Sequence, residues 1–491
     1  MNKKTTSLSQ FAVLMVLLLS SILFPQISAA GQTVSAKEVI EINTKADLVA
    51  LLNRVHPVDS RLVGDQKRYG VADVTINLNA DIEISSDDIN SQFPENTLYT
   101  KYEHAFTMDN SSFLGNGHTI TITQGTRRIY PLFEDLRVND PGTDFVAQVE
   151  RLSLVYKGNV YGSGFARGIA TAAWDGKTYH RIQKVNITVE GNILPISQKY
   201  WTLSEPVQYT LTRAAGFVQF VEGTEIRDIN IRVTGDIGTL TPEKEEHAQS
   251  ELIFSSSSGF IIESRSGYGD APPQTVDNLT INVGGSILAA GKHYRAVATG
   301  LGSNLGGKKF TNVQLKVAKD IKAVAEGDSV FTRIYHMSDP NLASAVGQYL
   351  LYIENGAIHI GGDISAANNT NVRMQTYAAG IVDWVPWYSK NEADLQQNPL
   401  TIKKLSLTVG GSVKAVSAAP QYIDSFLKVV TRASPGFSYG LNRAFKYDPD
   451  FQDNTIKIQG DVIADSQEGL TVAELWGYFT GTGNDLSAKS L

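Results

Sequence analysis

VNITVEGNI, residues 185–193, decides the fold, because apolar and polar residues alternate in it and the same arrangement recurs along the chain. Val185 and Ile187 share one parity, whereas Asn186 and Thr188 share the other. A period of two is typical of a β-strand that buries one face and exposes the other to solvent. This stretch therefore predicts a half-buried strand.

The nine-residue pattern apolar-x-apolar-x-apolar-x-Gly-x-apolar is repeated, and the repetition predicts how such strands assemble. Further copies lie at 152–160, 229–237, 279–287, 313–321, 356–364, 405–413 and 454–462, and an earlier version with Ala in place of Gly lies at 74–82. From Gly158 onward, equivalent positions are 33 to 50 residues apart, so the connections vary while the strand does not. One unit cannot close a core alone and has to stack on its neighbours. We therefore expect an all-β solenoid, a right-handed parallel β-helix, over residues 61–465. A propeller has blades of four strands at a more even period and fits less well.

Two details of the repeat carry further expectations. The glycine of each copy, such as Gly191, shares the inward parity, so we expect it to face the core; Lys319 departs from this in one copy. A weaker pattern of a small residue, Gly and an apolar residue recurs between the copies, at 164–165, 215–218, 258–261, 299–301, 379–382 and 439–441. It predicts a second strand in each repeat, and hence two strands per coil.

The first thirty residues have the composition of a secretion signal. Two lysines precede an apolar run from Phe11 to Phe24, and small residues follow as far as Ala30. Because the run is short for a membrane span, we expect a signal peptide at 1–30, cleavage, and no membrane span afterwards. The chain has no cysteine, which excludes disulfides and thiol chemistry. A net charge of −7 without basic runs argues against a nucleic-acid partner.

Both ends of the predicted solenoid carry segments that suit caps, which solenoids need. Near the start, Thr44 and Asp47 have the spacing of a capping box. Apolar residues then follow at helical spacing: Leu48, Leu51, Leu52 and Val55. At the other end, apolar residues suited to a second short cap are Val472, Leu475, Trp476 and Phe479. We expect short helical caps, within an N-terminal capping segment at 31–60 and a C-terminal cap and tail at 466–491.

The stretch 44–135 resembles a known kind of bacterial surface protein. It contains, in order, TKADLVALLNRV, INLNADIEI, FLGNGHTITI and PLFEDL. These segments and the later repeats resemble the β-helix adhesin-like domains with GLUG repeats and the pectate-lyase-like adhesive domains of Gram-positive bacteria. The resemblance implies a secreted or surface-displayed binding scaffold, and it implies no reaction.

A search for chemistry finds few motifs. HExxH, GxSxG and the P-loop are absent, and Gly115–His118 has the composition of a tight turn. The residue after each repeat glycine is polar: Asn159, Asn192, Asp236, Ser286, Asp320, Asp363, Ser412 and Asp461. In a parallel solenoid these residues stack. Asn, Asp and Ser in such a row are typical of turn residues whose side chains bond backbone amides. The Asp carboxylates could instead bind Ca²⁺ or act as an acid–base pair on a glycoside. Ser and Asn interrupt the carboxylates, so we expect no metal site and no cofactor.

Aromatic loops are the best indication of binding. Trp384, Trp387 and Tyr388 cluster around Pro386, and Tyr200 and Trp201 are expected in a loop after a coil. Pro cannot donate to a central ladder, so the first group is expected on a bulge or loop. Flat aromatic side chains stack on sugar rings or anchor protein interfaces, and they equally cover the flank of a β-helix.

Three functions remain open from the sequence. The first is a non-enzymatic, adhesin-like protein, secreted or at the cell surface, that binds a glycan or a host or cell-surface protein. The second is a polysaccharide lyase or glycoside hydrolase on the same scaffold, which requires clustered carboxylates with a Lys or Arg on one sheet. The third is a structural envelope protein that self-associates through an uncovered coil.

Overall fold

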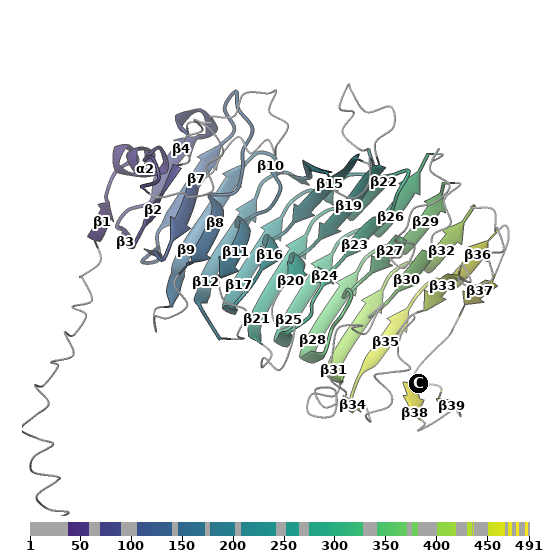
Figure 1. Cartoon of the computed structure of the whole chain (residues 1–491). Helices are drawn as coiled ribbons and strands as arrows, with labels where there is room; N and C mark the ends of the chain where they lie inside the picture. Colours follow the sequence, from purple (N-terminus) through teal and green to yellow (C-terminus); the bar gives the residue numbers. More distant parts are fainter. Residues whose placement is uncertain are drawn as a thin grey trace, which may run out of the picture. The chain divides into compact units, whose positions relative to one another are not determined.

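Parallel strands stacked coil upon coil make up the fold, which is a parallel β-helix (Figure 1). The computed structural model describes residues 38–57, 69–89, 106–139, 146–171, 177–201, 208–241, 252–264, 274–327, 341–370, 376–381, 400–418, 430–434, 436, 450–466, 470–473, 478–480 and 487–489. The predicted signal peptide at 1–30 lies outside these residues.

The longest strands form a 14-stranded sheet, here called sheet A. Its main strands are β9 (Ala147–Lys157), β12 (His180–Val189), β17 (Thr224–Val233), β21 (Gln274–Val283), β25 (Lys308–Val317), β28 (Tyr352–Ile360) and β31 (Thr401–Val409). At its ends lie β1 (Glu38–Ile42), β3 (Val74–Leu78), β4 (Ile82–Ser85), β6 (Ser112–Leu114), β7 (Thr119–Thr123), β34 (Asp450–Gln452) and β35 (Thr455–Ile458). The register places like residues opposite each other, since Ile187 pairs with Ile231 and Ile231 with Ile281. The predicted stacking of the repeats is confirmed.

A 16-stranded sheet, sheet C, contains two ladders. The first follows sheet A in each coil: β10 (Val160–Tyr161), β13 (Ile193–Leu194), β18 (Ile237–Gly238), β22 (Ile287–Lys292), β26 (Ile321–Glu326), β29 (Ile364–Asn369), β32 (Val413–Ser417) and β36 (Val462–Ser466). The second comprises β15 (Gln208–Ala215), β19 (Leu252–Ser258), β23 (Ala296–Thr299), β27 (Asn341–Ser344), β30 (Thr376–Ala379), β33 (Val430–Ser434) and β37 (Leu470–Ala473). An antiparallel strand, β14 (Ile196–Trp201), pairs with β15.

Sheet B has seven strands, and its pairings are parallel. They are β2 (Tyr69–Ala72), β5 (Phe106–Asp109), β8 (Phe133–Val138), β11 (Ala166–Thr171), β16 (Val218–Val221), β20 (Ile261–Ser264) and β24 (Gly302–Asn304). A full coil in this region therefore contributes strands to sheet A, to both ladders of sheet C and to sheet B. The expectation of two strands per coil is wrong.

The miscount has a local cause. The small-Gly-apolar pattern marks a corner between two strands, because β15 ends at Ala215 and β16 begins at Val218. At this corner a Cβ on Gly216 would lie 1.9 Å from the carbonyl oxygen of Gly259 in the next coil. The backbones approach so closely that a side chain does not fit. The pattern thus records a turn and not a strand.

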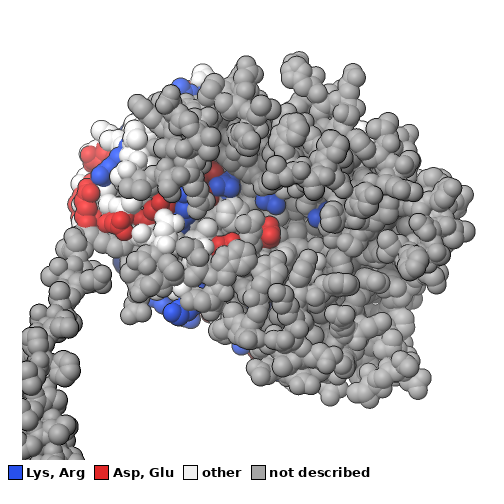
Figure 2. Space-filling model, in the orientation of Figure 1, with Lys and Arg blue, Asp and Glu red and all other residues white. Residues whose placement is uncertain are grey.

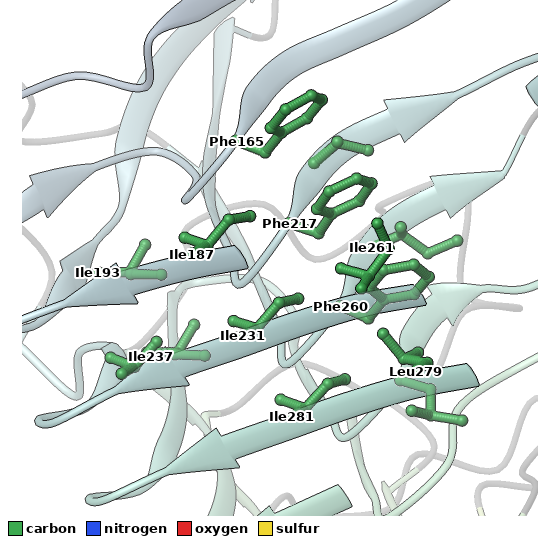
Figure 3. Close-up of a cluster of buried hydrophobic side chains, with 14 of the residues drawn as sticks. Phe165, Ile187, Ile193, Phe217, Ile231, Ile237, Phe260, Ile261, Leu279 and Ile281 are labelled. Atoms are coloured by element: carbon green, nitrogen blue, oxygen red, sulfur yellow. The ribbon is translucent and has the colours of Figure 1, made fainter. Parts of the chain in front are cut away.

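The core lies inside the coils and follows the predicted alternation. Ile231 and Ile281 are fully buried, whereas Arg232 and Asn282 are exposed. Figure 3 shows Ile187, Ile231 and Ile281 of sheet A in one row beside a row of phenylalanines. The ring of Phe217 stacks on that of Phe165 with 4.8 Å between centroids, and on that of Phe260 at 5.1 Å (Figure 3). Stacking at the coil repeat extends one apolar core through successive coils.

A residue with positive φ bends each long strand of sheet A. In β12 this residue is Lys184, with φ of 54°, and in β21 it is Asn278, also with φ of 54°. Left-handed residues of this kind are uncommon outside glycine, and Asn is among those that tolerate the conformation best. The bend resets the inward parity, so that Ile182 and Val185, three positions apart, are both buried. Each strand therefore has a first and a second segment on either side of this bend.

The repeat glycine does not face the core as expected. Gly191 is half-buried at the bend that follows β12, and the equivalent Lys319 is exposed. A Cβ on Gly191 would lie 2.5 Å from the carbonyl oxygen of Gly158 in the preceding coil. Glycine therefore suits the close approach of successive turns. In one later copy, the exposed Lys319 occupies the equivalent position.

The N-terminal segment contains the predicted helix. Helix α2 (Lys45–Leu52) begins with the expected capping box between Thr44 and Asp47, and buries Leu48, Leu51 and Leu52. Val55 lies beyond the helix and is exposed. Strand β1 precedes the helix and joins sheet A at β3. A short 3₁₀ helix, η1 (Ser86–Asp88), follows β4.

The C-terminal segment differs from the prediction at the residues that the structure describes. Val472 lies in strand β37, opposite Arg432 of β33, and Phe479 lies in β38 (Tyr478–Thr480), which pairs with β39 (Ser487–Lys489). The expectation of a helix at these two residues is wrong, because β37 adds a further strand to sheet C and β38 belongs to a separate two-stranded sheet. Leu475 and Trp476 lie outside the described residues. Within the described part of the chain, no helix is both long and apolar enough to cross a membrane.

Candidate functional sites

The predicted aromatic site falls largely beyond what the structure describes. Trp384, Trp387 and Tyr388 lie outside the described residues. Tyr200 and Trp201 were expected in a loop, but they lie in strand β14. Tyr200 is paired with Tyr209 of β15, and Trp201 with Gln208, in an antiparallel hairpin.

The polar row after the repeat glycines is a continuous hydrogen-bonded ladder. The side-chain oxygen of Asn159 accepts from the backbone N–H of Asn192 at 2.9 Å, and that of Asn192 accepts from Asp236 at 2.8 Å. The same bond then joins Asp236 to Ser286, Ser286 to Asp320, Asp320 to Asp363, Asp363 to Ser412 and Ser412 to Asp461. Each side chain thus satisfies a turn amide of the next coil. The interpretation as backbone-bonding turn residues is confirmed.

The ladder offers little to a cation, because an oxygen of each side chain already accepts a backbone proton. Asp363 additionally contacts Nζ of Lys414 at 2.8 Å. Among the described residues there is no group of three or more His, Asp or Glu side chains placed to hold a metal ion. Ca²⁺ takes six to eight oxygen ligands, and this arrangement does not gather them.

A second cluster lies on sheet B and was missed by the sequence analysis. Glu134 and Asp135 of β8 contact two arginines, Arg137 of the same strand and Arg167 of β11. One terminal nitrogen of Arg167 lies 2.8 Å from Oδ1 and 2.7 Å from Oδ2 of Asp135. Its Nε donates to Glu134, and its guanidinium lies 5.2 Å from the ring centre of Phe220. In Figure 2, most of the acidic and basic side chains of described residues that are in view lie at the left, and a few more lie towards the middle.

Burial decides what this cluster can do. The side chain of Asp135 is 3% exposed and that of Glu134 is 9% exposed. Burial raises the pKa of Glu134 to about 7, against the opposing effect of the Arg167 guanidinium. Two carboxylates and two guanidiniums balance in charge, which is how charged groups are retained away from water. In the sequence, only the run Glu-Asp-Leu-Arg at 134–137 points to this cluster, because Arg167, which pairs with both carboxylates, comes from another coil.

A third group lies inside the solenoid, at the first residues of successive strands of sheet A. Nζ of Lys308 donates to Oε1 of Gln274 at 2.6 Å and to the carbonyl oxygen of Thr224 at 3.1 Å. Burial lowers the pKa of Lys308 to about 7. Burial also lowers the pKa of His180 to about 4. The contact between a ring nitrogen of His180 and the carbonyl oxygen of Ala170 opposes this shift. Both side chains are shielded from solvent, so they are placed to shape the core and not to meet a ligand.

The fourth feature is the outer surface of sheet A beyond the bend. Two columns of outward-facing residues run across β12, β17, β21, β25, β28, β31 and β35, and we call them the acid-free strip. One column is Asn186, Asn230, Thr280, Gln314, Ala357, Ser406 and Thr455. The other is Thr188, Arg232, Asn282, Lys316, His359, Thr408 and Lys457. All are exposed or half-buried, and no Asp or Glu is among them.

The first segment of the same strands differs, because it includes acidic residues that form ion pairs with cations. Arg181 contacts Glu225 at 3.2 Å, Arg227 contacts the same carboxylate, and Lys403 contacts Asp450. Within the described part of the chain, no ion pair involves Arg232, Lys316 or Lys457 of the strip. The first segment therefore carries charges of both signs, whereas the strip beside it carries cations and no Asp or Glu.

The remaining sequence features are structural or exposed. Asn116 and Gly117 have φ of 54° and 91°, which confirms the tight turn. His359 of β28 is exposed. His336 lies outside the described residues.

Comparison of the chain with protein-family models, with curated proteins and with solved structures finds no match. The geometry described above therefore supplies the argument about function.

Proposed function

We propose that this protein is a secreted or surface-displayed, adhesin-like scaffold that binds a glycan on the outer face of its solenoid. The observation that carries the proposal is the acid-free strip. Apart from Ala357 and His359, its side chains are amides, hydroxyls and cations on a continuous sheet surface, exposed or half-buried, such as Asn230, Thr280 and Gln314. Amides and hydroxyls both donate and accept hydrogen bonds, as sugar hydroxyls do.

The arrangement suits binding more than turnover. A β-sheet fixes each side chain by its register, so successive coils present their side chains at a constant step of about 4.8 Å. A rigid, pre-organised surface loses little conformational entropy when it binds an extended partner. The resemblance to adhesin-like domains and the composition of residues 1–30 support the same location and role.

A glycan array tests the proposal. We expect the labelled protein to bind at least one glycan class, and a bulkier side chain on the strip, in Ala357→Leu, to weaken that binding. Ser365→Leu, which adds a similar side chain on sheet C, serves as the control and should bind like the wild type. Absence of binding to any glycan, or equal effects of both substitutions, would contradict the proposal.

A further inference from the structure

The cations of the acid-free strip lie in one column, and the register fixes their order. Arg232 of β17 is followed by Asn282 of β21 and Lys316 of β25. His359 of β28 lies next to Lys316, and Lys457 of β35 follows Thr408 of β31. These side chains are fixed relative to one another by backbone pairing and not by flexible loops.

The column runs from coil to coil, so its spacing is a multiple of the coil step. With about 4.8 Å between neighbouring strands, Arg232 and Lys316 lie about 10 Å apart along the column. Lys316 and Lys457, three strands apart, are separated by about 14 Å on the same basis. A linear polymer lying across the strands would meet a cation at intervals of two to three coils.

The charge of the rest of the protein makes this strip unusual. The chain carries 50 acidic residues and a net charge of −7. An anionic polymer is repelled by such a surface in general and is attracted where cations are present without acids. Within the two columns of the strip, none of the residues next to Arg232, Lys316 or Lys457 is an Asp or Glu.

The neighbours of the cations indicate the type of polymer. The strip contains Asn, Thr, Gln and Ser beside the cations, and it contains no Phe, Tyr or Trp. Proteins that bind single-stranded nucleic acids combine a basic groove with aromatic platforms for the bases, which this strip lacks. Sugar hydroxyls, by contrast, find both donors and acceptors among these amides and hydroxyls.

We infer that the acid-free strip binds a linear anionic polysaccharide, with carboxylates along its chain, laid parallel to the solenoid axis. Carboxylates contact Arg232, Lys316 and Lys457, and ring hydroxyls contact the neighbouring amides and hydroxyls. The coil step is close to the length of one pyranose unit in an extended chain, so successive sugars meet successive coils. This inference rests on the proposed function and names the class of glycan.

Polygalacturonate is the probe, and fully methyl-esterified polygalacturonate is the matched ligand without charge. The double variant Arg232→Gln, Lys316→Gln removes two cations from the strip. Lys292→Gln, Lys322→Gln removes the same charge from sheet C and serves as the control. We expect the first variant to bind polygalacturonate about tenfold more weakly or worse, equivalent to about 1.4 kcal/mol, and the control to bind like the wild type. Wild-type binding should weaken as salt is added.

Three outcomes would overturn the inference. They are equal binding of the esterified polymer, equal loss in both double variants, and equally tight binding of poly-glutamate, which carries carboxylates without sugars. If the wild type binds neutral glycans on the array and the Arg232, Lys316 variant is unaffected, the inference fails while the proposed function stands. If no glycan binds at all, the proposed function fails as well.

Discussion

The side-chain oxygen of Asn192 accepts a hydrogen bond from the backbone N–H of Asp236, which lies 44 residues later in the chain, over 2.8 Å. The same bond recurs at each turn that follows sheet A, from Asn159 to Asp461. A residue in one repeat is thus required by the backbone of the next repeat. This relationship explains why oxygen-bearing side chains follow the repeat glycine in every copy.

Asn192→Ala should destabilise the protein, because the amide of Asp236 loses its acceptor at a partly buried turn. The expected loss is about 1–2 kcal/mol. Asn186→Ala, at an exposed position whose amide bonds only to Ser153 of the neighbouring strand, is the control and should change stability by less than about 0.5 kcal/mol. Chemical denaturation measures both, and equal midpoints for the two variants would show that the ladder does not stabilise the fold.

The alternation of sheet A makes a second prediction. Ile281→Asp places a carboxylate in the core without a partner and should cost about 4 kcal/mol or more. Asn282→Asp, one position along the same strand, leaves the new carboxylate in solvent and should leave the stability almost unchanged. Thermal unfolding followed by circular dichroism distinguishes them, and similar melting temperatures would contradict the assignment of the two faces.

Lys308 predicts how stability depends on pH. Its pKa is about 7 in the folded protein and 10.5 in its ordinary state, so the unfolded chain binds more protons between these values. Stability therefore rises as the pH increases from about 7 towards 10.5. His180, with a folded pKa of about 4 and an ordinary value of 6.5, adds a rise at lower pH. Lys308→Met should remove the rise between pH 7 and 9 in denaturation midpoints, and an unchanged slope would contradict the role of this lysine.

The cluster on sheet B predicts a strong effect of removing one arginine. Arg167→Met leaves Glu134 and Asp135 in place without one of their partners, and should cost about 3–5 kcal/mol. Arg181→Met breaks an ion pair whose arginine is 41% exposed, and should cost less than about 1 kcal/mol. Comparable denaturation midpoints for the two variants would show that the sheet B cluster contributes no more than a surface pair does.

The fold could be predicted from the sequence because the deciding information repeats. In VNITVEGNI the alternation fixes which residues are buried, and its recurrence fixes what they stack on. The number of strands per coil could not be predicted, because the pattern around Gly216 records the close approach of two backbones at a corner. A glycine required by a corner and one that lies in a strand look alike in sequence.

The candidate sites were harder to predict because their residues come from different coils. Arg167 lies 33 residues from Glu134, and Lys316 lies 84 residues from Arg232; only the register of sheets A and B brings each pair onto one surface. The aromatic cluster around Trp384 was prominent because it is local, and it falls outside the described residues. Chemistry that is assembled across coils leaves no continuous motif.

Binding of polygalacturonate to the Asn282→Asp variant tests the central claim most directly. Asn282 lies between Arg232 and Lys316 in the strip, and the substitution adds one negative charge there with almost no change in size. Equilibrium titration should show clearly weaker binding than for the wild type, while the melting temperature stays the same. Binding as tight as that of the wild type, with the fold intact, would contradict the claim that the acid-free strip holds an anionic glycan.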